Sequence, residues 1–366
     1  MIHNRFRGVL YRVLFVSVLL FIQCFFEKCT DEPPTVSKPP EDTTTTSHDF
    51  VFDRYFLGDN WSTLADVVVI NDTCAIAVGW MYKVDSAGMF TTYNLARWNG
   101  KRWSLDTVSS YLPDGQISID PLAGILVFSE NDIVLSTGAS AMHWNGKKWK
   151  GLGILYGAGW AVGNPRRLWG KSSDDFYGVG SGGSIVHWDG RKWDKIYTAI
   201  STTVQDIWGG TDPKNGETTI YCLASEDYSN DSKRIMRIDN LHSIAVMDST
   251  GLSVLQNGIW FDPGKKYYTV GAGVYWKNDI ESAESWTRIK PGEATLYYSN
   301  AIRGAAWNDI FVVGAFNEVA HFNGKTWMRY PLFLNSNLWR VSYKGNLMVA
   351  VGDDGRRGIA VVGRRR

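Results

Sequence analysis

The chain has little of what marks several common classes of protein. Its 366 residues include only four cysteines, and 38 basic residues are balanced by 37 acidic ones. With a formal net charge of +1, there is no electrostatic reason to expect a nucleic acid or an anionic surface as partner. The sequence contains no phosphate-binding glycine loop, no G-x-S-x-G nucleophile elbow and no C-x-x-C pair. It therefore predicts no catalytic residue, no metal site and no cofactor.

Long apolar runs are also missing, with one exception near the N-terminus. Residues 13–26 are almost entirely apolar, and three arginines precede them. A basic start before about 7–15 apolar residues is the pattern of a secretory signal peptide, whereas a membrane-spanning helix needs about 20. Residues 30–48 then form a Pro- and Thr-rich stretch that cannot bury enough apolar surface to order itself. We expect an exported protein with an N-terminal segment (1–29), a disordered linker (30–48) and one folded domain (49–366).

The end of the N-terminal segment resembles the start of a mature bacterial lipoprotein. Cys29 is followed by T-D-E-P-P, a polar tether of the kind that follows a lipidated cysteine. Lys28 precedes Cys29 and Gln23 precedes Cys24, where a lipobox has a small residue. The resemblance implies lipidation of Cys29 or Cys24, and a cleaved signal peptide is the alternative. The protein is then expected in the periplasm, on the outer membrane or outside the cell, touching a membrane only through an N-terminal anchor.

What the chain does contain is a repeated aromatic hairpin. The motif, an aromatic residue followed by Asn or Asp, Gly, a basic residue, any residue and Trp, occurs at Trp98–Trp103, Trp144–Trp149, Trp188–Trp193 and Phe322–Trp327. The Asp189-Gly190 pair and its equivalents predict hairpins with two-residue type I′ turns, in which both residues have positive φ. The starts are 46, 44 and 134 residues apart, and the last step is about three periods. A period of about 45 residues matches a four-stranded propeller blade.

A second marker gives the number of blades. Before each hairpin a β-rich run ends at a small residue, and this happens at Gly79, Gly138, Gly180, Ala224, Gly271, Gly314 and Gly352. The seventh unit has only one further strand after its marker, while the alternating segment Phe50–Phe56 lies upstream of the first unit without a partner. Pairing this segment with the last blade would remove two sheet edges. The sequence predicts an all-β fold, a single seven-bladed, monomeric propeller of four-stranded blades closed by its N-terminal strand.

Residues that recur once per blade are interpreted as structural. His143, His187 and His321 occupy one repeat position in different blades, so they cannot converge on a metal ion. The acidic pairs of the same blades, such as Asp174-Asp175, fall at predicted turns between strands A and B, where Asp and Asn cap backbone amides. The tryptophans that open strand D are expected to pack between neighbouring blades, and they are Trp103, Trp149, Trp193 and Trp327.

Two cysteines fall within the predicted propeller. Cys74 and Cys222 lie on equivalent strands of the first and fourth blades, across the ring from each other. Two Cα atoms more than about 7 Å apart cannot be bridged by a disulfide. We expect both residues to be buried free thiols.

The candidate binding residues are those that differ from blade to blade. Strand A lines the central channel of a propeller, and its polar residues here are Asp66, Arg167, Asp206, Arg303 and Arg340. The longest departures from the repeat are Lys83–Thr92, Asp212–Thr218 and Ser225–Lys233. The first and third of these both lie between strands B and C, so they are expected on one face. That face and the five channel residues form the predicted ligand-binding surface, with neutral insertions as the alternative.

The stretch Leu168–Trp193 resembles the repeat of the BNR/kelch-like propeller group. It is also similar to the photosystem II assembly-factor-like propellers of exported bacterial proteins. The resemblance implies the fold and no particular activity. The Asp-box S-x-D-x-G-x-x-W of sialidase relatives has no clear copy here, and their arginine triad cannot be placed.

Two classes of function follow from the sequence. The first is a non-catalytic binding or scaffolding propeller of the bacterial cell envelope, with a protein or glycan partner. The alternative is a glycan-active hydrolase or lyase with its site at the channel mouth. Two carboxylates about 5–9.5 Å apart in a cleft would favour the hydrolase. Unpaired arginines and aromatic side chains without such a pair would favour binding.

Overall fold

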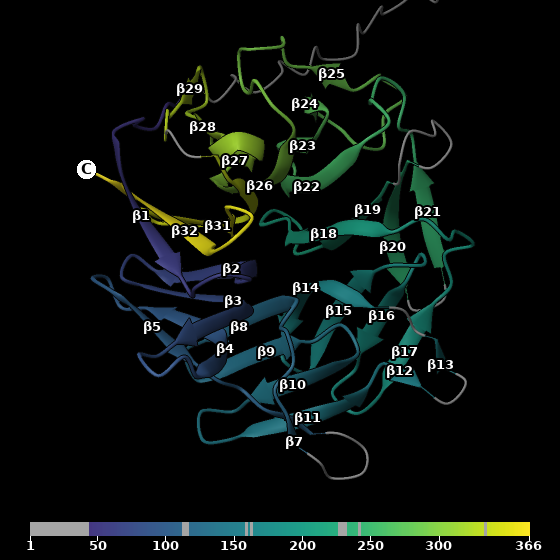
Figure 1. Ribbon diagram of the computed structural model, residues 1–366. Helices are drawn as coiled ribbons and strands as arrows, with labels where there is room; N and C mark the ends of the chain where they lie inside the picture. The colour runs from purple at the N-terminus through teal and green to yellow at the C-terminus, as the bar shows by residue number, and fades with distance from the viewer. Residues whose placement is uncertain are drawn as a thin grey trace, which may run out of the picture. The chain divides into compact units, whose positions relative to one another are not determined.

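The computed structural model describes residues 44–111, 117–157, 160–161, 164–225, 233–240, 243–332 and 335–366. Apart from one short 3-10 helix, η1 (Ala315–Asn317), their regular structure is β. Seven four-stranded antiparallel sheets surround a common centre, so the fold is the predicted seven-bladed propeller (Figure 1). Within these ranges no helix is long and apolar enough to cross a membrane.

The strands of each blade are lettered A to D from the centre outward. The first three blades are β2 (Thr63–Asn71), β3 (Cys74–Val84), β4 (Phe90–Trp98) and β5 (Trp103–Asp106); β8 (Gly124–Ser129), β9 (Asp132–Ser136), β10 (Ser140–Trp144) and β11 (Trp149–Ile154); and β14 (Pro165–Ser172), β15 (Asp175–Gly180), β16 (Ile185–Trp188) and β17 (Trp193–Ile196). Two short strand pairs occur in the connections, β6 (Ser110–Tyr111) with β7 (Ile117–Ser118) and β12 (Tyr156–Gly157) with β13 (Trp160–Ala161).

The remaining four blades follow the same order. They are β18 (Val204–Thr211), β19 (Thr218–Ala224), β20 (Arg234–Asn240) and β21 (Ser243–Met247); β22 (Gln256–Asp262), β23 (Lys266–Gly271), β24 (Gly273–Lys277) and β25 (Thr287–Arg288); β26 (Ser299–Ala306), β27 (Asp309–Gly314), β28 (Val319–Phe322) and β29 (Trp327–Arg329); and β30 (Asn337–Lys344), β31 (Leu347–Asp353), β32 (Gly358–Arg365) and β1 (Phe50–Leu57).

The N-terminal strand closes the seventh blade, as the sequence predicts. β1 pairs antiparallel with β32, from Phe50 opposite Arg365 to Leu57 opposite Gly358. Figure 1 shows the two strands, purple and yellow, side by side. Phe50 is buried, and its ring meets the edge of Phe311 in the sixth blade with centroids 4.9 Å apart. The ring is therefore joined by a hydrogen-bonded ladder where the two ends of the domain meet.

The residues just before β1 lie against the sixth blade. The backbone N–H of Thr46 donates to the carbonyl of Asn323 at 3.0 Å. Nδ1 of His48 lies 2.8 Å from Nδ1 of the fully buried His321, and the Tyr330 hydroxyl donates to the carbonyl of His48 at 2.6 Å. These contacts fix the direction from which the chain approaches the closing strand.

The hairpins that carry the repeat differ from the predicted turn. Trp188 pairs directly with Trp193, so the loop is longer than the predicted two-residue Asp189-Gly190 turn. Of those two residues only Gly190 has a positive φ, of 88°, which excludes type I′. The Asp189 carboxylate instead accepts hydrogen bonds of 2.8 Å from the two backbone N–H groups that follow Gly190. The Asn of the other three copies makes the same contacts, which explains why the motif has Asn or Asp before Gly.

Each repeated histidine bonds an aspartate of its own blade. The distance from the histidine Nε2 to the carboxylate oxygen is 2.7 Å in all three cases, and the pairs are His143 with Asp132, His187 with Asp175 and His321 with Asp309. The aspartates begin strand B, next to the turn, and the histidines face them from strand C. The histidines therefore join strands within separate blades. Among the described residues, no group of His, Cys, Asp and Glu could hold a metal ion.

Apolar side chains fill the spaces between blades. One cluster joins the first and seventh blades around Leu64, Trp98 and Val349, and burying a side chain of this size contributes about 1.5–3 kcal/mol. The predicted packing of the four repeated tryptophans against neighbouring blades is confirmed, because each lies on a cluster shared by two blades. Cys74 and Cys222 are free, on strand B of the first and fourth blades. The prediction that both are buried is wrong for Cys74, which is half-exposed at the start of β3 beside a turn.

Candidate functional site at the channel mouth

The innermost strands share a β-bulge near their beginning. In six of the seven blades the pairing of strand A with strand B shifts by one residue at this point. A bulge re-aims one side chain, and bulges are frequent beside functional sites. The inserted residues are Ala65, Arg166, Gln205, Asn257, Asn300 and Trp339.

A small residue in strand B faces each bulge. The partner of the residue before the bulge is Gly79, Gly180, Ala224, Gly271, Gly314 or Gly352, which are six of the markers that gave the number of blades. A methyl group on Gly180 would lie 1.9 Å from the backbone oxygen of Asn164, and one on Gly352 would lie 1.8 Å from that of Asn337. At these glycines strand A approaches too closely for any side chain.

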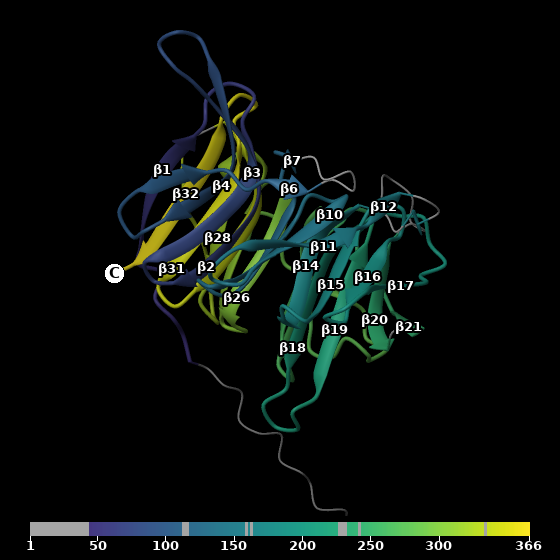
Figure 2. The same cartoon turned by 90° about the horizontal axis from the view of Figure 1, so that it is seen from below.

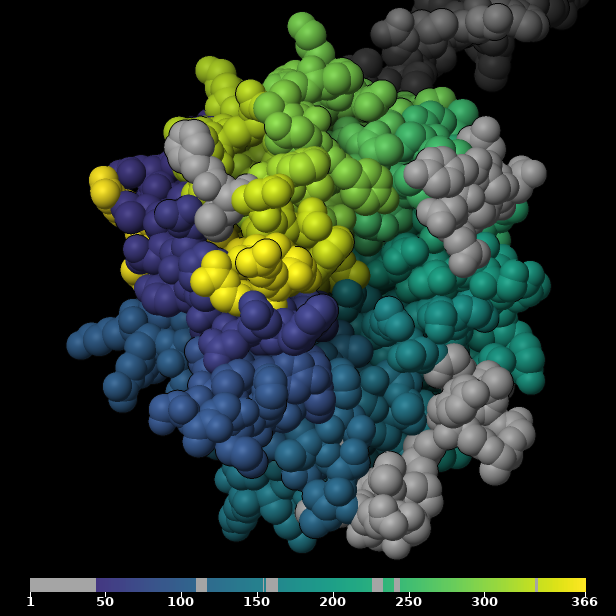
Figure 3. Space-filling view, viewed as in Figure 1, coloured from purple at the N-terminus to yellow at the C-terminus, as the bar shows by residue number. Residues whose placement is uncertain are grey.

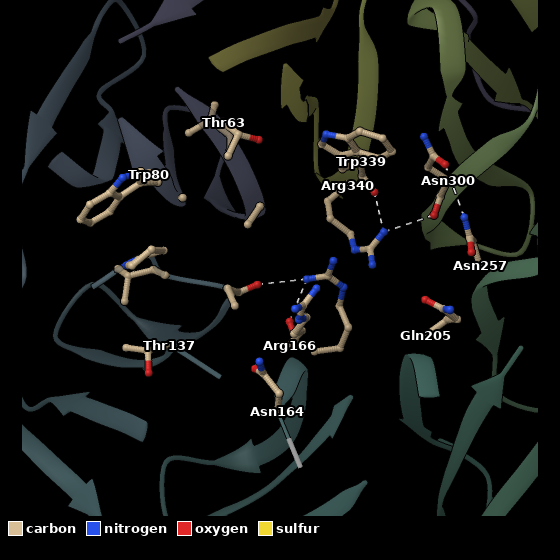
Figure 4. Close-up of a pocket in the computed structure, with 17 residues that line it drawn as sticks. Thr63, Trp80, Thr137, Asn164, Arg166, Gln205, Asn257, Asn300, Trp339 and Arg340 are labelled. Atoms are coloured by element: carbon tan, nitrogen blue, oxygen red, sulfur yellow. Dashed lines mark hydrogen bonds between the residues drawn. The ribbon is translucent and has the colours of Figure 1, made fainter. Parts of the chain in front are cut away.

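All six bulge residues line one cavity of about 500 Å³ at a mouth of the central channel (Figure 4). The space-filling view shows the surface hollowed near the centre of the ring (Figure 3). Figure 4 shows the side chains of Arg340, Asn300 and Asn257 next to one another on one side of the cavity and Trp80 on the other. The Asn257 amide donates to Asn300 Oδ1 at 3.4 Å, and the Asn300 amide donates to the carbonyl of Leu338 at 3.0 Å. These bonds fix the orientation of both amides.

A buried ion pair occupies the channel beyond the cavity. Arg303 of the sixth blade reaches past the fifth to Asp206 of the fourth, with two hydrogen bonds of 2.9 Å. Asp206 also accepts from the backbone N–H of Ile259 at 3.0 Å, and the Arg303 guanidinium lies 4.9 Å from the centroid of the Trp208 ring. Burial alone would raise the pKa of Asp206, but the attraction of Arg303 and these hydrogen bonds lower it below its usual range. The ion pair therefore connects three blades, and the charges of Asp206 and Arg303 neutralise each other.

A looser pair lies on the opposite side of the channel. Nη1 of Arg167 is 3.8 Å from the Asp66 carboxylate and donates to the carbonyl of Ala123 at 3.1 Å. Asp66 accepts from the backbone N–H of Val67 at 2.9 Å and from that of Ile125 in the next blade at 3.4 Å. Burial raises the pKa of Asp66 and lowers that of Arg167, because at this distance each compensates only part of the other's loss of water.

Arg340 is the cation without a carboxylate partner. Its Nη1 donates to the carbonyls of Trp339 at 2.6 Å and Asn300 at 3.3 Å, and its Nε is buried without an acceptor. No carboxylate of the described residues lies within salt-bridge distance of it. Burial, with the repulsion of Arg167, lowers the pKa of Arg340 to about 9. The guanidinium is thus charged at neutral pH, and Asp206 and Asp66, which attract it from beyond salt-bridge distance, compensate its charge only in part.

The hairpin between β3 and β4 rises beside the cavity. Trp80, which lines the cavity, donates its indole N–H to the Tyr82 hydroxyl, and the two ring centroids are 5.7 Å apart. The Tyr82 ring is 6.3 Å from that of Phe90, which is 66% exposed at the far end of the hairpin. Asp59 holds this hairpin, with its carboxylate accepting from the backbone N–H of Val84 at 2.9 Å. An aromatic row therefore leads from the cavity to an exposed tip.

The structure brings the five predicted channel residues together but gives them different surroundings. Arg167 and Arg340 line the cavity, whereas Asp66, Asp206 and Arg303 do not. The bulge residues and Trp80 are not among the residues predicted from the sequence. The marker glycines are the feature that could have indicated the bulge residues. In five of the six blades, the strand A residue that pairs with the marker glycine is followed directly by the inserted residue. The regular alternation of strand A gave no reason to expect a bulge at this point.

The three longest departures from the repeat, two of which were predicted to form the recognition face, have different outcomes. Lys83–Thr92 contains the ends of β3 and β4 and projects on the cavity side. Asp212–Thr218 is the turn between β18 and β19, and Figure 2 shows it on the opposite face. Of Ser225–Lys233, residues 226–232 lie outside the described residues.

Comparison with known proteins shows the fold alone. No protein-family model matches the chain, and no match is found among curated protein sequences. Among solved structures, the chain is similar to Ycf48 bound to a D1 peptide, with a TM-score of 0.62 and 13% identity over 88% of this chain and 99% of that one. A catalytically inactive virginiamycin B lyase from Staphylococcus aureus with quinupristin gives a TM-score of 0.59 at 13% identity over 85% of this chain and 99% of that one. The WD40 propeller domain of Doa1 gives 0.56 at 15% identity over 85% and 96%.

These similarities agree with the architecture described above. The chain is a seven-bladed β-propeller of four-stranded blades, and its structural neighbours include a propeller with a bound peptide and a lyase. The fold therefore does not decide between the two classes of function, and the choice depends on the chemistry of the site.

Proposed function

We propose that the protein is a non-catalytic binding propeller that holds an acidic partner in the channel-mouth cavity and along the β3–β4 hairpin. The observation that carries this proposal is the charge of Arg340, which has no carboxylate within salt-bridge distance, in a cavity that also contains Arg166, Arg167 and two tryptophans. A partly buried cation without a carboxylate in contact is costly, and a ligand carboxylate would reduce that cost.

The chemistry of the lining favours binding over hydrolysis. None of the described residues that line the cavity is Asp, Glu or His. The nearby acids Asp66 and Asp206 are engaged by arginines and backbone amides. Asp353 accepts from the Thr63 hydroxyl at 2.9 Å and from the Trp339 indole N–H at 2.7 Å, and none of these three acids lines the cavity. A glycan hydrolase needs one carboxylic acid and one carboxylate facing the scissile bond. The cavity offers hydrogen-bond donors and aromatic faces instead.

A protein partner agrees with one of the structural neighbours, since Ycf48 was solved with a D1 peptide. The likeness is one of fold, so it supports the class of partner and not its identity. We propose the exported, BNR/kelch-like interpretation on the sequence pattern, with the domain monomeric and tethered at the cell envelope through a lipidated Cys29 or Cys24.

Envelope tethering has its own test. Cells that express the full chain are labelled with a palmitate analogue, and wild type is compared with Cys29→Ala and Cys24→Ala. Loss of label in one variant identifies the lipidated residue. Export without label in any of the three would replace the anchored form by a soluble periplasmic or secreted one.

Binding is tested by site-specific loss of a partner. Envelope extracts are passed over immobilised wild type, Arg340→Gln and Arg191→Gln, the last an exposed arginine of a turn between strands C and D. The proposal expects proteins retained by wild type and by Arg191→Gln but lost from Arg340→Gln. Equal retention by all three, or release of reducing sugar ends when the protein is incubated with envelope glycans, would contradict it.

A further inference from the structure

We infer that the cavity recognises the free C-terminal carboxylate of an extended peptide. This inference rests on the proposed function and names the chemical group that the site selects. It follows from the charge of the channel, the position of the buried ion pair, the amides of the bulge layer and the aromatic row of the hairpin.

The charge of the channel fits a monoanion. Its side chains include three guanidinium groups, Arg167, Arg303 and Arg340, and two carboxylates, Asp66 and Asp206, which leaves one positive charge. One carboxylate makes this cluster neutral, whereas a phosphate dianion would make it negative. Arg166, at the exposed rim, adds an attraction that solvent screens.

The donor geometry also fits a carboxylate. Arg340 uses Nη1 for two carbonyls, and no hydrogen bond of its Nη2 is formed with the described residues. Arg167 likewise bonds through Nη1, and its Nε has no acceptor among them. A planar carboxylate can accept from two guanidinium groups at once, and such charge-assisted bonds are about twice as strong as neutral ones.

The depth of the cavity favours a chain end. Asp206 directly follows the bulge residue Gln205, so the Asp206–Arg303 pair occupies the channel just beyond the bulge layer and is absent from the cavity lining. A ligand that enters from the mouth and reaches Arg167 and Arg340 therefore lies next to this ion pair. A terminal group can take that position while the rest of its chain stays at the mouth.

The walls fit a peptide behind that terminal group. Gln205, Asn257 and Asn300 place side-chain amides around the cavity, and an amide can pair with the N–H and C=O groups of a peptide backbone. Outside the cavity the aromatic row from Trp80 to Phe90 continues, and Val84 and Met89 beside it are 42% and 66% exposed. Exposed aliphatic and aromatic side chains match apolar peptide side chains better than the hydroxyl groups of a sugar acid.

The inference is tested with two peptide pools that differ only at the C-terminus. A pool of random hexapeptides with free C-terminal carboxylates and the same pool with C-terminal amides are each passed over immobilised full-length protein, and retained peptides are sequenced by mass spectrometry. Affinities of the selected peptides are then measured by calorimetry in both forms. Arg340→Gln and Arg191→Gln serve as site variant and control, and thermal unfolding verifies that each is folded.

We expect peptides selected from the free-acid pool to bind wild type and Arg191→Gln at least about tenfold more tightly than their amides or than Arg340→Gln, the loss for a hydrogen bond to a charged group. Equal affinity of acid and amide for wild type overturns the inference and leaves the proposed function standing. Two other results also overturn the inference and leave the proposed function standing. One is selection of peptides with internal Asp or Glu whatever their C-terminus, and the other is binding of a galacturonate oligomer in place of peptides. Retention from neither pool, with no binding of the galacturonate oligomer, overturns both.

Discussion

Replacing Asp206 by Asn should destabilise the domain by removing the partner of a buried arginine. The substitution keeps the size of the side chain and an oxygen that can accept from Ile259, but it removes the charge opposite Arg303. Breaking a buried ion pair costs about 3–5 kcal/mol. The Arg303 side chain is 18% exposed and keeps its contacts with Trp208 and the carbonyl of Ile302, so the lower end, about 3 kcal/mol, is expected.

The assay is urea unfolding followed by circular dichroism, at equal slope for wild type and variants. The double variant Asp206→Asn/Arg303→Met should recover most of the loss, because it removes the unpaired charge as well. Asp194→Asn, which breaks an exposed contact with Lys192, is the matched control and should have no measurable effect. If Asp206→Asn unfolds within about 1 kcal/mol of wild type, the pair does not hold the channel as described.

Three further outcomes follow from the structure. Phe50→Ala should cost about 3 kcal/mol in urea unfolding, because it leaves a cavity where the closing strand meets the sixth blade, and an unchanged midpoint would contradict that packing. Burial lowers the pKa of both His48 and His321, so docking of residues 44–49 should be complete above about pH 6.5 and lost as the pH falls through the two folded values. Equal protection factors at pH 7.5 and 5, calculated from hydrogen exchange against the intrinsic rate at each pH, would refute this. Gly180→Ala should unfold at lower urea by about 1–3 kcal/mol, because its methyl group would lie 1.9 Å from a backbone oxygen, and wild-type stability would show that the bulge is not required.

Much of the fold could be predicted because its physical causes recur in the sequence. The small residue at the end of strand B is required in six blades, where strand A bulges against it, and in the second blade Gly138 has a positive φ of 89° instead. A marker therefore appears once per blade and gives the count of seven. The closing strand could be predicted because Phe50–Phe56 alternates and has no other partner. The turn type could not, since a side-chain cap by Asp189 and a longer loop use the same Asp-Gly pair as a type I′ turn.

The site could be predicted only in part. Arg167 and Arg340 were found because the polar residues of strand A differ between blades, but their division into paired and unpaired cations depends on distances across the ring. Asn257 and Asn300 were missed because a strand without a bulge would direct them away from the channel. Trp80 was missed because it lies on strand B, beyond the marker glycine, in a hairpin that only the structure places beside the cavity.

The unfolding midpoint of Arg340→Met, with and without peptide, tests most directly whether this residue is kept for binding. A partly buried charge without a carboxylate in contact lowers the stability of the free protein, so the variant should be more stable than wild type by about 1 kcal/mol in the absence of ligand. Excess free-acid peptide selected by wild type should raise the wild-type midpoint and leave that of the variant unchanged. A variant that is less stable than wild type when free, or that is stabilised equally by the peptide, would show that Arg340 serves the fold and does not bind the ligand.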